Sequence, residues 1–355
     1  MSKRNLLLLF LLLCPFAGAR SADDVLKLYF KSIGIQQGLS HQMVNAIVKD
    51  PQGFIWIGTA EGLNRYDGTE FHVYRHEPGN PCSLSTSWIN CLYITRDGRL
   101  FIGTEKGVNV YNAQKENFER ISAKNDSRNL LGNLRIRCFC EDSKGYLWIG
   151  TLDGLIRFDR RNGLINFYKL NHYDRDKMHN EVRSLCEDSA GRLWIGTFDG
   201  LYCRETESGV FKSVPLKKAP AEGNCLISGL HIQQEDPHTL YIAATGGLRV
   251  FDTETGGERH YHTANSGIAS NDVRDVTRYD AKHVLAATSS GLSVFDIPSG
   301  SFTNFANSIT DPVSLPTQIV RCLFQDDNGL VWLGTNYGVA CCNSHRRPID
   351  VHYIN

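Results

Sequence analysis

The sequence predicts an all-β fold, a seven-bladed β-propeller with about four antiparallel strands in each blade. Two observations carry this prediction: a phrase centred on Trp-Ile-Gly-Thr recurs at intervals of 43 to 48 residues, and a Leu-Ser-like phrase precedes its copies at a constant offset. Repeats of this length, each with four short strands, are typical of propeller blades. The threonines that mark the seven repeats are Thr59, Thr104, Thr151, Thr197, Thr245, Thr288 and Thr335.

Each repeat offers four strands in a constant order. In the first repeat, an alternating segment runs up to Lys49, the Trp phrase lies at 54–59, a third strand spans 63–66 and an aromatic one spans 71–74. Glycine-containing turns separate these segments, which is the pattern of short strands joined by hairpins. We therefore expect one blade per repeat, over residues 24–347.

The residues that recur in the repeats have structural interpretations. A large aromatic side chain suits the layer between adjacent blades, glycine allows close approach of the backbone, and β-branched threonine suits a strand. Aspartates before the glycine turns suit capping of their own backbone, whereas a glycosidase needs two carboxylates in distinct environments. The tryptophans and aspartates interpreted in this way are Trp56, Trp148, Trp194 and Trp332, and Asp50, Asp142, Asp188 and Asp326.

An aromatic segment before the first repeat predicts how the ring closes. Leu28–Lys31 has the character of a fourth strand and stands before the first Leu-Ser phrase. We expect residues 27–32 to pair with the last blade, which removes the unpaired edge that an open array would expose. In the alternative arrangement, Ile349–Tyr353 forms the outer strand of the seventh blade.

Residues 1–19 have the pattern of a signal peptide. Lys3 and Arg4 precede an apolar run that ends at Cys14, and this run is too short for a transmembrane helix, which needs about 20 apolar residues. We therefore expect a periplasmic protein with no membrane span in the mature chain. Lipidation of Cys14 is the alternative, although the leucines before it lack the small residues that such a site favours. Residues 348–355 form a tail or begin a further domain.

The charge balance excludes one class of function. Removal of the signal peptide takes away two of the 38 basic residues and none of the 38 acidic ones, which leaves a formal charge of about −2. Nucleic-acid binding depends on a positive surface that neutralises phosphates. We therefore expect no nucleic acid among the partners of this segment.

The repeats resemble the two-component regulator propeller repeat, found in periplasmic sensors of hybrid two-component systems of gut Bacteroidetes. The matching residues are Gly38–Ser40, Asp50–Thr59 and Gly62–Gly68, and the resemblance extends over about residues 27–345. In that family, two propellers and an immunoglobulin-like domain precede a membrane helix, a histidine kinase, a receiver and a helix-turn-helix domain. The resemblance implies that the chain corresponds to the N-terminal propeller, with any kinase in a region absent from this chain.

The resemblance also implies a function, because the known ligands of the family are mostly oligosaccharides from plant or host glycans. It implies a non-catalytic sensor of a glycan-derived oligosaccharide, with the further domains of a sensor kinase or a second copy of the chain as partners. Two alternatives come from other classes: a secreted lyase or glycosidase acting on polysaccharide, and a structural propeller that mediates dimerisation. An enzyme should show a non-repeated cluster of catalytic side chains on one face, whereas the polar positions here mostly repeat.

Four arginines are candidates for ligand binding. They stand one residue before a small-residue slot in the innermost strand, and Asn45 and Asn90 share their register. Equivalent positions converge at the axis of a propeller, and a guanidinium cluster binds carboxylates or sulfates, which suits acidic sugars. In the alternative, they pair with acidic neighbours such as Glu181, Asp272 and Asp275 and tie the blades together. The four candidates are Arg137, Arg183, Arg274 and Arg321.

Trp88 is the fifth candidate for ligand binding. It is the only tryptophan outside the repeated slot, and it stands in the loop that leads into the second repeat. A platform for a sugar ring is the functional interpretation of this indole, and packing within the loop is the alternative.

Ten cysteines remain after the signal peptide, in a compartment that permits disulfides. Cys91, Cys138 and Cys322 share one small-residue slot, so we expect buried thiols near the axis rather than disulfides. Neither the Cys138-x-Cys140 spacing nor the adjacent pair at 341–342 is that of a zinc site. We expect no metal and no cofactor.

Overall fold

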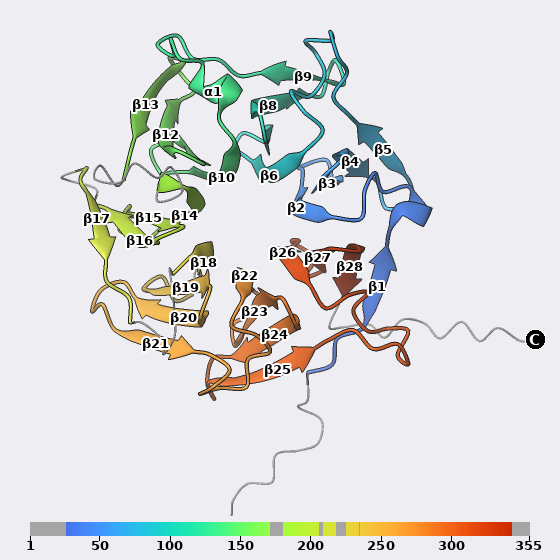
Figure 1. Ribbon diagram of the computed structural model, residues 1–355, viewed down its shortest axis with the longest axis vertical. Helices are drawn as coiled ribbons and strands as arrows, with labels where there is room; N and C mark the ends of the chain where they lie inside the picture. Colours follow the sequence, from blue (N-terminus) through green and yellow to red (C-terminus); the bar gives the residue numbers. More distant parts are fainter. Residues whose placement is uncertain (1–25, 171–179, 206–208, 218–224, 234, 343–355) are drawn as a thin grey trace, which may run out of the picture.

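The computed structural model describes residues 26–170, 180–205, 209–217, 225–233 and 235–342, and within them seven four-stranded antiparallel sheets surround a central axis (Figure 1). Each sheet corresponds to one repeat, so the predicted seven-bladed β-propeller is confirmed. In six of the blades the strands follow chain order from the axis outwards, as consecutive hairpins require.

The first three blades begin at the innermost strands β2, β6 and β10. Their strands are β2 (Val44–Lys49), β3 (Ile55–Thr59), β4 (Gly62–Tyr66) and β5 (Phe71–Tyr74); β6 (Ile89–Ile94), β7 (Leu100–Thr104), β8 (Gly107–Asn112) and β9 (Asn117–Arg120); and β10 (Ile136–Glu141), β11 (Leu147–Thr151), β12 (Gly154–Asp159) and β13 (Leu164–Tyr168).

The remaining blades begin at the innermost strands β14, β18, β22 and β26. Their strands are β14 (Val182–Glu187), β15 (Leu193–Thr197), β16 (Gly200–Arg204) and β17 (Phe211–Val214); β18 (Ile227–Ile232), β19 (Thr239–Ala244), β20 (Gly247–Asp252) and β21 (Glu258–Tyr261); β22 (Val273–Arg278), β23 (His283–Thr288), β24 (Gly291–Asp296) and β25 (Ser301–Phe305); and β26 (Val320–Gln325), β27 (Val331–Thr335) and β28 (Gly338–Cys342).

The N-terminal strand closes the ring, as predicted. β1 (Phe30–Ile33) pairs antiparallel with β28, with Phe30 opposite Cys342 and Ile33 opposite Val339. The paired segment therefore begins and ends slightly later than the expected span of 27–32, and it occupies the outer edge of β28. The alternative outer strand, Ile349–Tyr353, and the predicted signal peptide lie outside the described residues.

The hydrophobic core consists of layers between adjacent blades. Trp148 of β11 is 2% exposed and packs against Val182 and Leu193 of the next blade, and the other three repeated tryptophans belong to equivalent clusters. The glycine two residues later makes this contact possible, because a Cβ at Gly150 would lie 2.8 Å from Cγ1 of Val182 and 2.4 Å from Sγ of Cys138. The repeated glycine is therefore a site of close approach between blades.

The repeated threonine has a role beyond its preference for strands. Its Oγ1 donates a hydrogen bond to the carbonyl oxygen of Gly154 at 2.8 Å and accepts the N–H of Asp153 at 3.2 Å in the third blade, where the threonine is Thr151. Five other repeats contain the same two bonds. The hydroxyl thus caps the hairpin between the second and third strands, which a valine of the same shape could not do.

The turn aspartates cap their own backbone. Asp142 accepts the N–H groups of Lys144 at 3.0 Å and Tyr146 at 2.9 Å, and its second oxygen accepts the indole N–H of Trp148 at 2.7 Å. The indole bond joins the turn to the layer between blades, and it is present for Trp56, Trp148 and Trp194.

Two short helices interrupt the all-β architecture in the described part of the chain. The 3-10 helix η1 (Ile35–Gln37) and the helix α1 (Leu130–Asn133) both lie in loops that lead into innermost strands. Neither was expected from the sequence. No helix among the described residues has the length and apolar character that crossing a membrane requires.

Candidate functional site

Every innermost strand has a β-bulge at its second residue. In β10, Ile136 pairs with Thr151 and Cys138 pairs with Gly150, so the ladder skips Arg137. A bulge leaves one residue unpaired and re-aims its side chain, and here these residues line the axis. The seven bulge residues are Asn45, Asn90, Arg137, Arg183, Ser228, Arg274 and Arg321.

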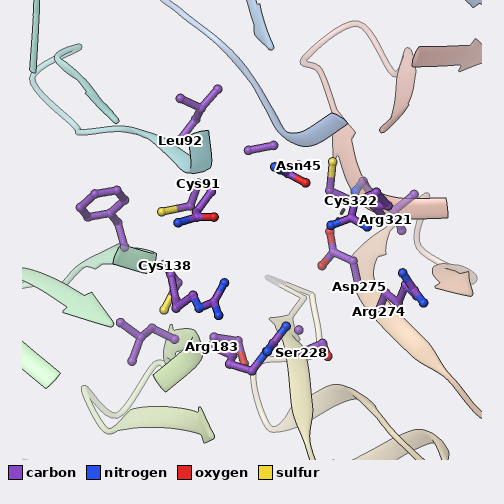
Figure 2. Close-up of a pocket in the computed structure, with 18 of the residues that line it drawn as sticks. Asn45, Cys91, Leu92, Cys138, Arg183, Ser228, Arg274, Asp275, Arg321 and Cys322 are labelled. Atoms are coloured by element: carbon purple, nitrogen blue, oxygen red, sulfur yellow. Dashed lines mark hydrogen bonds between the residues drawn. The ribbon is translucent and has the colours of Figure 1, made fainter. Parts of the chain in front are cut away.

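The bulge side chains line one axial pocket, a cavity of about 920 Å³ (Figure 2). Trp88 and Arg135, from loops that lead into the innermost strands, also line it. The mouth of the pocket therefore lies on the face of the propeller formed by these loops. The four arginines and Trp88 that the sequence singled out are therefore brought together. Their role in binding stays a prediction.

The arginines form two neighbouring pairs around the ring. Arg137 and Arg183 belong to the third and fourth blades, and Arg274 and Arg321 belong to the sixth and seventh. Ser228 separates the pairs on one side, and the two asparagines separate them on the other. The ring is therefore uneven, with guanidinium groups on two arcs and amides on a third.

Three of the four arginines contact carboxylates. Glu181, whose side chain is 3% exposed, lies 2.7 Å from Nε of Arg137 and 3.2 Å from Nη1 of Arg183. Asp272 lies 2.9 Å from Nη2 of Arg274. These arginines thus take part in ion pairs that hold the pocket wall, and Glu181 joins two blades.

Arg321 has no carboxylate within ion-pair distance among the described residues. Its Nη1 donates to Oδ1 of Asn336 at 3.2 Å, and its Nε is buried without a hydrogen-bond partner. Burial lowers the pKa of Arg321, and the positive charges of Arg274 and Arg183 lower it further. The positive charge of Arg321 is therefore not paired with any carboxylate of the described residues.

The third arc of the ring carries amides. Asn45 donates through Nδ2 to the carbonyl oxygen of Ile89 at 2.8 Å, and Oδ1 of Asn90 accepts the indole N–H of Trp88 at 3.0 Å. The other polar atom of each amide, Oδ1 of Asn45 and Nδ2 of Asn90, is buried without a protein partner. Trp88 is 39% exposed, so part of its ring is open at the rim of the pocket.

Asp275 lies in the pocket wall directly after the bulge of β22. Its Oδ1 accepts the N–H of Val276 at 2.9 Å, and its Oδ2 accepts the N–H of Leu323 in the next blade at 2.8 Å. No ion pair joins it to an arginine among the described residues, so the pairing suggested by the sequence is not present. Burial raises the pKa of Asp275 to about 6.

Three cysteines, Cys91, Cys138 and Cys322, also line the pocket. None of the ten cysteines in the described residues takes part in a disulfide. Burial raises the pKa of the Cys322 thiol to about 12, so this group stays protonated at neutral pH and is a poor nucleophile. Among the described residues, no group of three or more His, Cys, Asp or Glu side chains is arranged to hold a metal ion.

The fold and the pocket define a seven-bladed β-propeller with a polar, arginine-rich axial pocket. A family model described as two component regulator propeller matches five segments of the chain. Five of the seven blades therefore contain a segment similar to the two-component regulator propeller repeat. The matched segments are residues 38–61, 83–106, 129–153, 176–199 and 314–337.

Similar structures include the extracellular domains of two hybrid two-component systems from B. thetaiotaomicron. The domain of BT4673 superposes with a TM-score of 0.74 at 22% identity, over 89% of this chain and 40% of that domain. The domain of BT3049 gives 0.72 at 23% identity, over 90% of this chain and 42% of that domain. The chain thus spans about two fifths of these structures, and the likeness shows a shared fold.

Two further proteins are similar to this chain, one over a short segment of sequence and one in fold. Histidine kinase P4 of Formosa agariphila is 43% identical over 56 residues, which are 16% of this chain and 4% of the kinase. Virginiamycin B lyase of Staphylococcus aureus, solved with quinupristin, has a TM-score of 0.67 at 12% identity, over 89% of this chain and 99% of the lyase. At that identity, the lyase also shows the fold alone.

Proposed function

We propose that the chain is the ligand-binding propeller of an exported sensor protein, and that its axial pocket takes an oligosaccharide released from a glycan. The match of five segments to the repeat-family model and the likeness to extracellular domains of two-component systems support the sensor role. The signal-peptide pattern of residues 1–19 supports export to the periplasm. The structural likeness and the sequence pattern are independent of each other.

The observation that carries the proposal is the convergence of seven bulge side chains on one pocket. Its volume of about 920 Å³ lies within the range of small-molecule sites. Amide and guanidinium groups can hydrogen-bond the hydroxyl groups of a sugar, and the half-exposed indole of Trp88 can cover the apolar face of its ring. Each bulge removes one residue pair from the ladder of its blade. A role of the bulge side chains in ligand binding accounts for its presence in all seven blades.

The carboxylates of the pocket support a role in binding without catalysis. Glu105 is paired with Arg135, and Asp272 is paired with Arg274. Asp275 has a raised pKa, which is a property of many general bases, but both of its oxygens already accept backbone N–H groups. We therefore assign these carboxylates to the construction of the pocket wall.

A screen against oligosaccharides tests this function. The mature chain is applied to an array of plant and host oligosaccharides, and the dissociation constants of the hits are measured by calorimetry. We expect a defined set of hits, with affinity reduced about tenfold by Trp88→Ala, since an aromatic stacking contact is lost. Tyr337→Ala is the matched control, because Tyr337 is 66% exposed and lies outside the pocket. Absence of any oligosaccharide hit would rule out the proposed function.

A further inference from the structure

We propose that Arg321 selects the ligand, and that the ligand is an oligosaccharide with a single acidic group, such as a uronic acid or a sulfated sugar. This inference rests on the proposed function and adds to it the charge of the ligand and its orientation in the pocket. Three features of the pocket lead to it: the balance of charges, the donors of Arg321 that have no protein acceptor among the described residues, and the positions of unpartnered polar atoms.

The charge balance of the pocket leaves one positive charge. The four arginines of the ring face three carboxylates, those of Glu181, Asp272 and Asp275. Arg135 and Glu105 at the rim neutralise each other. One acidic group on the ligand therefore makes the net charge of the pocket zero. A second acidic group would have no unpaired cation in the pocket and would be repelled by the carboxylates of the wall.

Arg321 is the arginine of this ring that has no ion pair with a carboxylate of the described residues. A guanidinium has five N–H donors, and in Arg321 one of them bonds to a protein acceptor, Oδ1 of Asn336. The group is partly buried and near the like charges of Arg183 and Arg274. An anion bound here relieves this repulsion, and its charge-assisted hydrogen bonds are strengthened by the low local dielectric.

Unpartnered polar atoms continue from Arg321 along one arc of the ring. Nε of Arg321, Oδ1 of Asn45 and Nδ2 of Asn90 lie on β26, β2 and β6, which follow one another around the ring (Figure 1), and each is buried without a partner among the described residues. On the opposite arc, the hydroxyl of Ser184 also lacks a partner, while Nε of Arg137 faces Glu181. Buried polar atoms without partners destabilise a protein, so hydroxyl groups of a ligand on this arc would be stabilising.

These positions orient the ligand. The acidic group lies against Arg321, the next hydroxyl groups meet the amides of Asn45 and Asn90, and a sugar ring reaches Trp88 at the rim. Arg137 and Arg183 stand on the other side of the ring and already share Glu181. Their part is to build the wall, and the selective contact is that of Arg321.

The test compares acidic and neutral oligosaccharides on the same array, with calorimetry on Arg321→Gln, Arg321→Lys and Arg99→Gln. We expect binding of uronic or sulfated oligosaccharides that Arg321→Gln weakens at least tenfold and Arg321→Lys weakens less. Arg99 lies outside the axial pocket, so Arg99→Gln removes one charge and should leave binding unchanged. Wild-type affinity should also fall as salt is raised from about 50 to about 500 mM.

The outcomes separate this inference from the proposed function. If only neutral oligosaccharides bind, or if acidic ones bind Arg321→Gln as well as wild type, Arg321 is not the selective residue and the sensor function stands. If no oligosaccharide binds, the sensor function itself is wrong. Thermal melts show whether the variants fold, and we expect Arg321→Gln to melt at or above wild type because one like charge has been removed.

Discussion

Asp275 and Arg321 lie in the same pocket wall, but their side chains have different numbers of protein hydrogen-bond partners. Asp275 is bonded to backbone N–H groups of two blades, and burial raises its pKa to about 6. Arg321 has one hydrogen bond to a protein acceptor, Oδ1 of Asn336, among the described residues. The carboxylate is thus part of the scaffold, and the guanidinium is open to a partner from solution.

The raised pKa of Asp275 predicts a pH-dependent contribution to stability. The fold favours the protonated acid, so this contribution is complete below the ordinary pKa of 3.8 and is lost as the pH rises through about 6. We expect the free energy of unfolding of wild type, relative to that of Asp275→Asn, to fall by on the order of 1 to 3 kcal/mol between about pH 4 and about pH 7. Urea titrations of both proteins at several pH values measure this difference, and a constant difference would contradict the assignment.

At the scale of the element, each blade is a set of hairpins whose turns are closed by side chains. A threonine hydroxyl caps one hairpin, an aspartate caps the other, and the glycine between them allows the next blade to approach. The first aliphatic residue of each innermost strand is fully buried, as in Val182. The residues of the repeated phrase therefore form contacts between blades as well as within them.

Gly150→Ala tests this contact between blades. The new Cβ would lie 2.4 Å from Sγ of Cys138 and 2.8 Å from Cγ1 of Val182, and overpacking of this kind costs about 1 to 3 kcal/mol. The matched control is Gly267→Ala, where the nearest atom is Cβ of Phe302 at 3.8 Å and the expected change is within about 0.5 kcal/mol. Equal denaturation midpoints for the two variants would show that the layer can adjust freely.

At the scale of the molecule, the ring is closed by pairing between the first and last strands of the described chain. β1 contributes Phe30 and Ile33, which are 3% and 5% exposed, to the layers around the seventh blade. Closure also covers the edge of β28, and an exposed edge of this kind can pair with other chains. The same closure holds the seven bulges in one ring and so maintains the axial pocket.

A truncation tests the closure. Removal of residues up to Ile33 deletes β1, and we expect a lower melting temperature and association of the protein, because an apolar layer and a strand edge become exposed. The control removes only residues up to 25 and leaves β1 intact. Light scattering after size-exclusion chromatography measures both, and a monomeric truncated protein with an unchanged melting temperature would show that β1 is dispensable.

The sequence by itself determined the number of blades, the order of strands and the position of the polar ring. Each of these follows from a local pattern that repeats. Residues equivalent to Trp148 and Gly150 occur in other blades because each blade packs against its neighbours in the same way. The convergence of Arg137, Arg183, Arg274 and Arg321 could be predicted for the same reason, since equivalent positions of a ring lie at equal distances from its axis.

Tertiary structure alone decided which of these arginines have a carboxylate partner. Glu181 stands two residues before Arg183 in sequence, yet it also contacts Arg137 of the preceding blade, while Asp275 bonds the backbone of Leu323. Ion pairs form according to distance in space, and the loops that set these distances do not repeat. The period of the sequence therefore determines where the pocket lies, and the non-repeated contacts around it determine its charge.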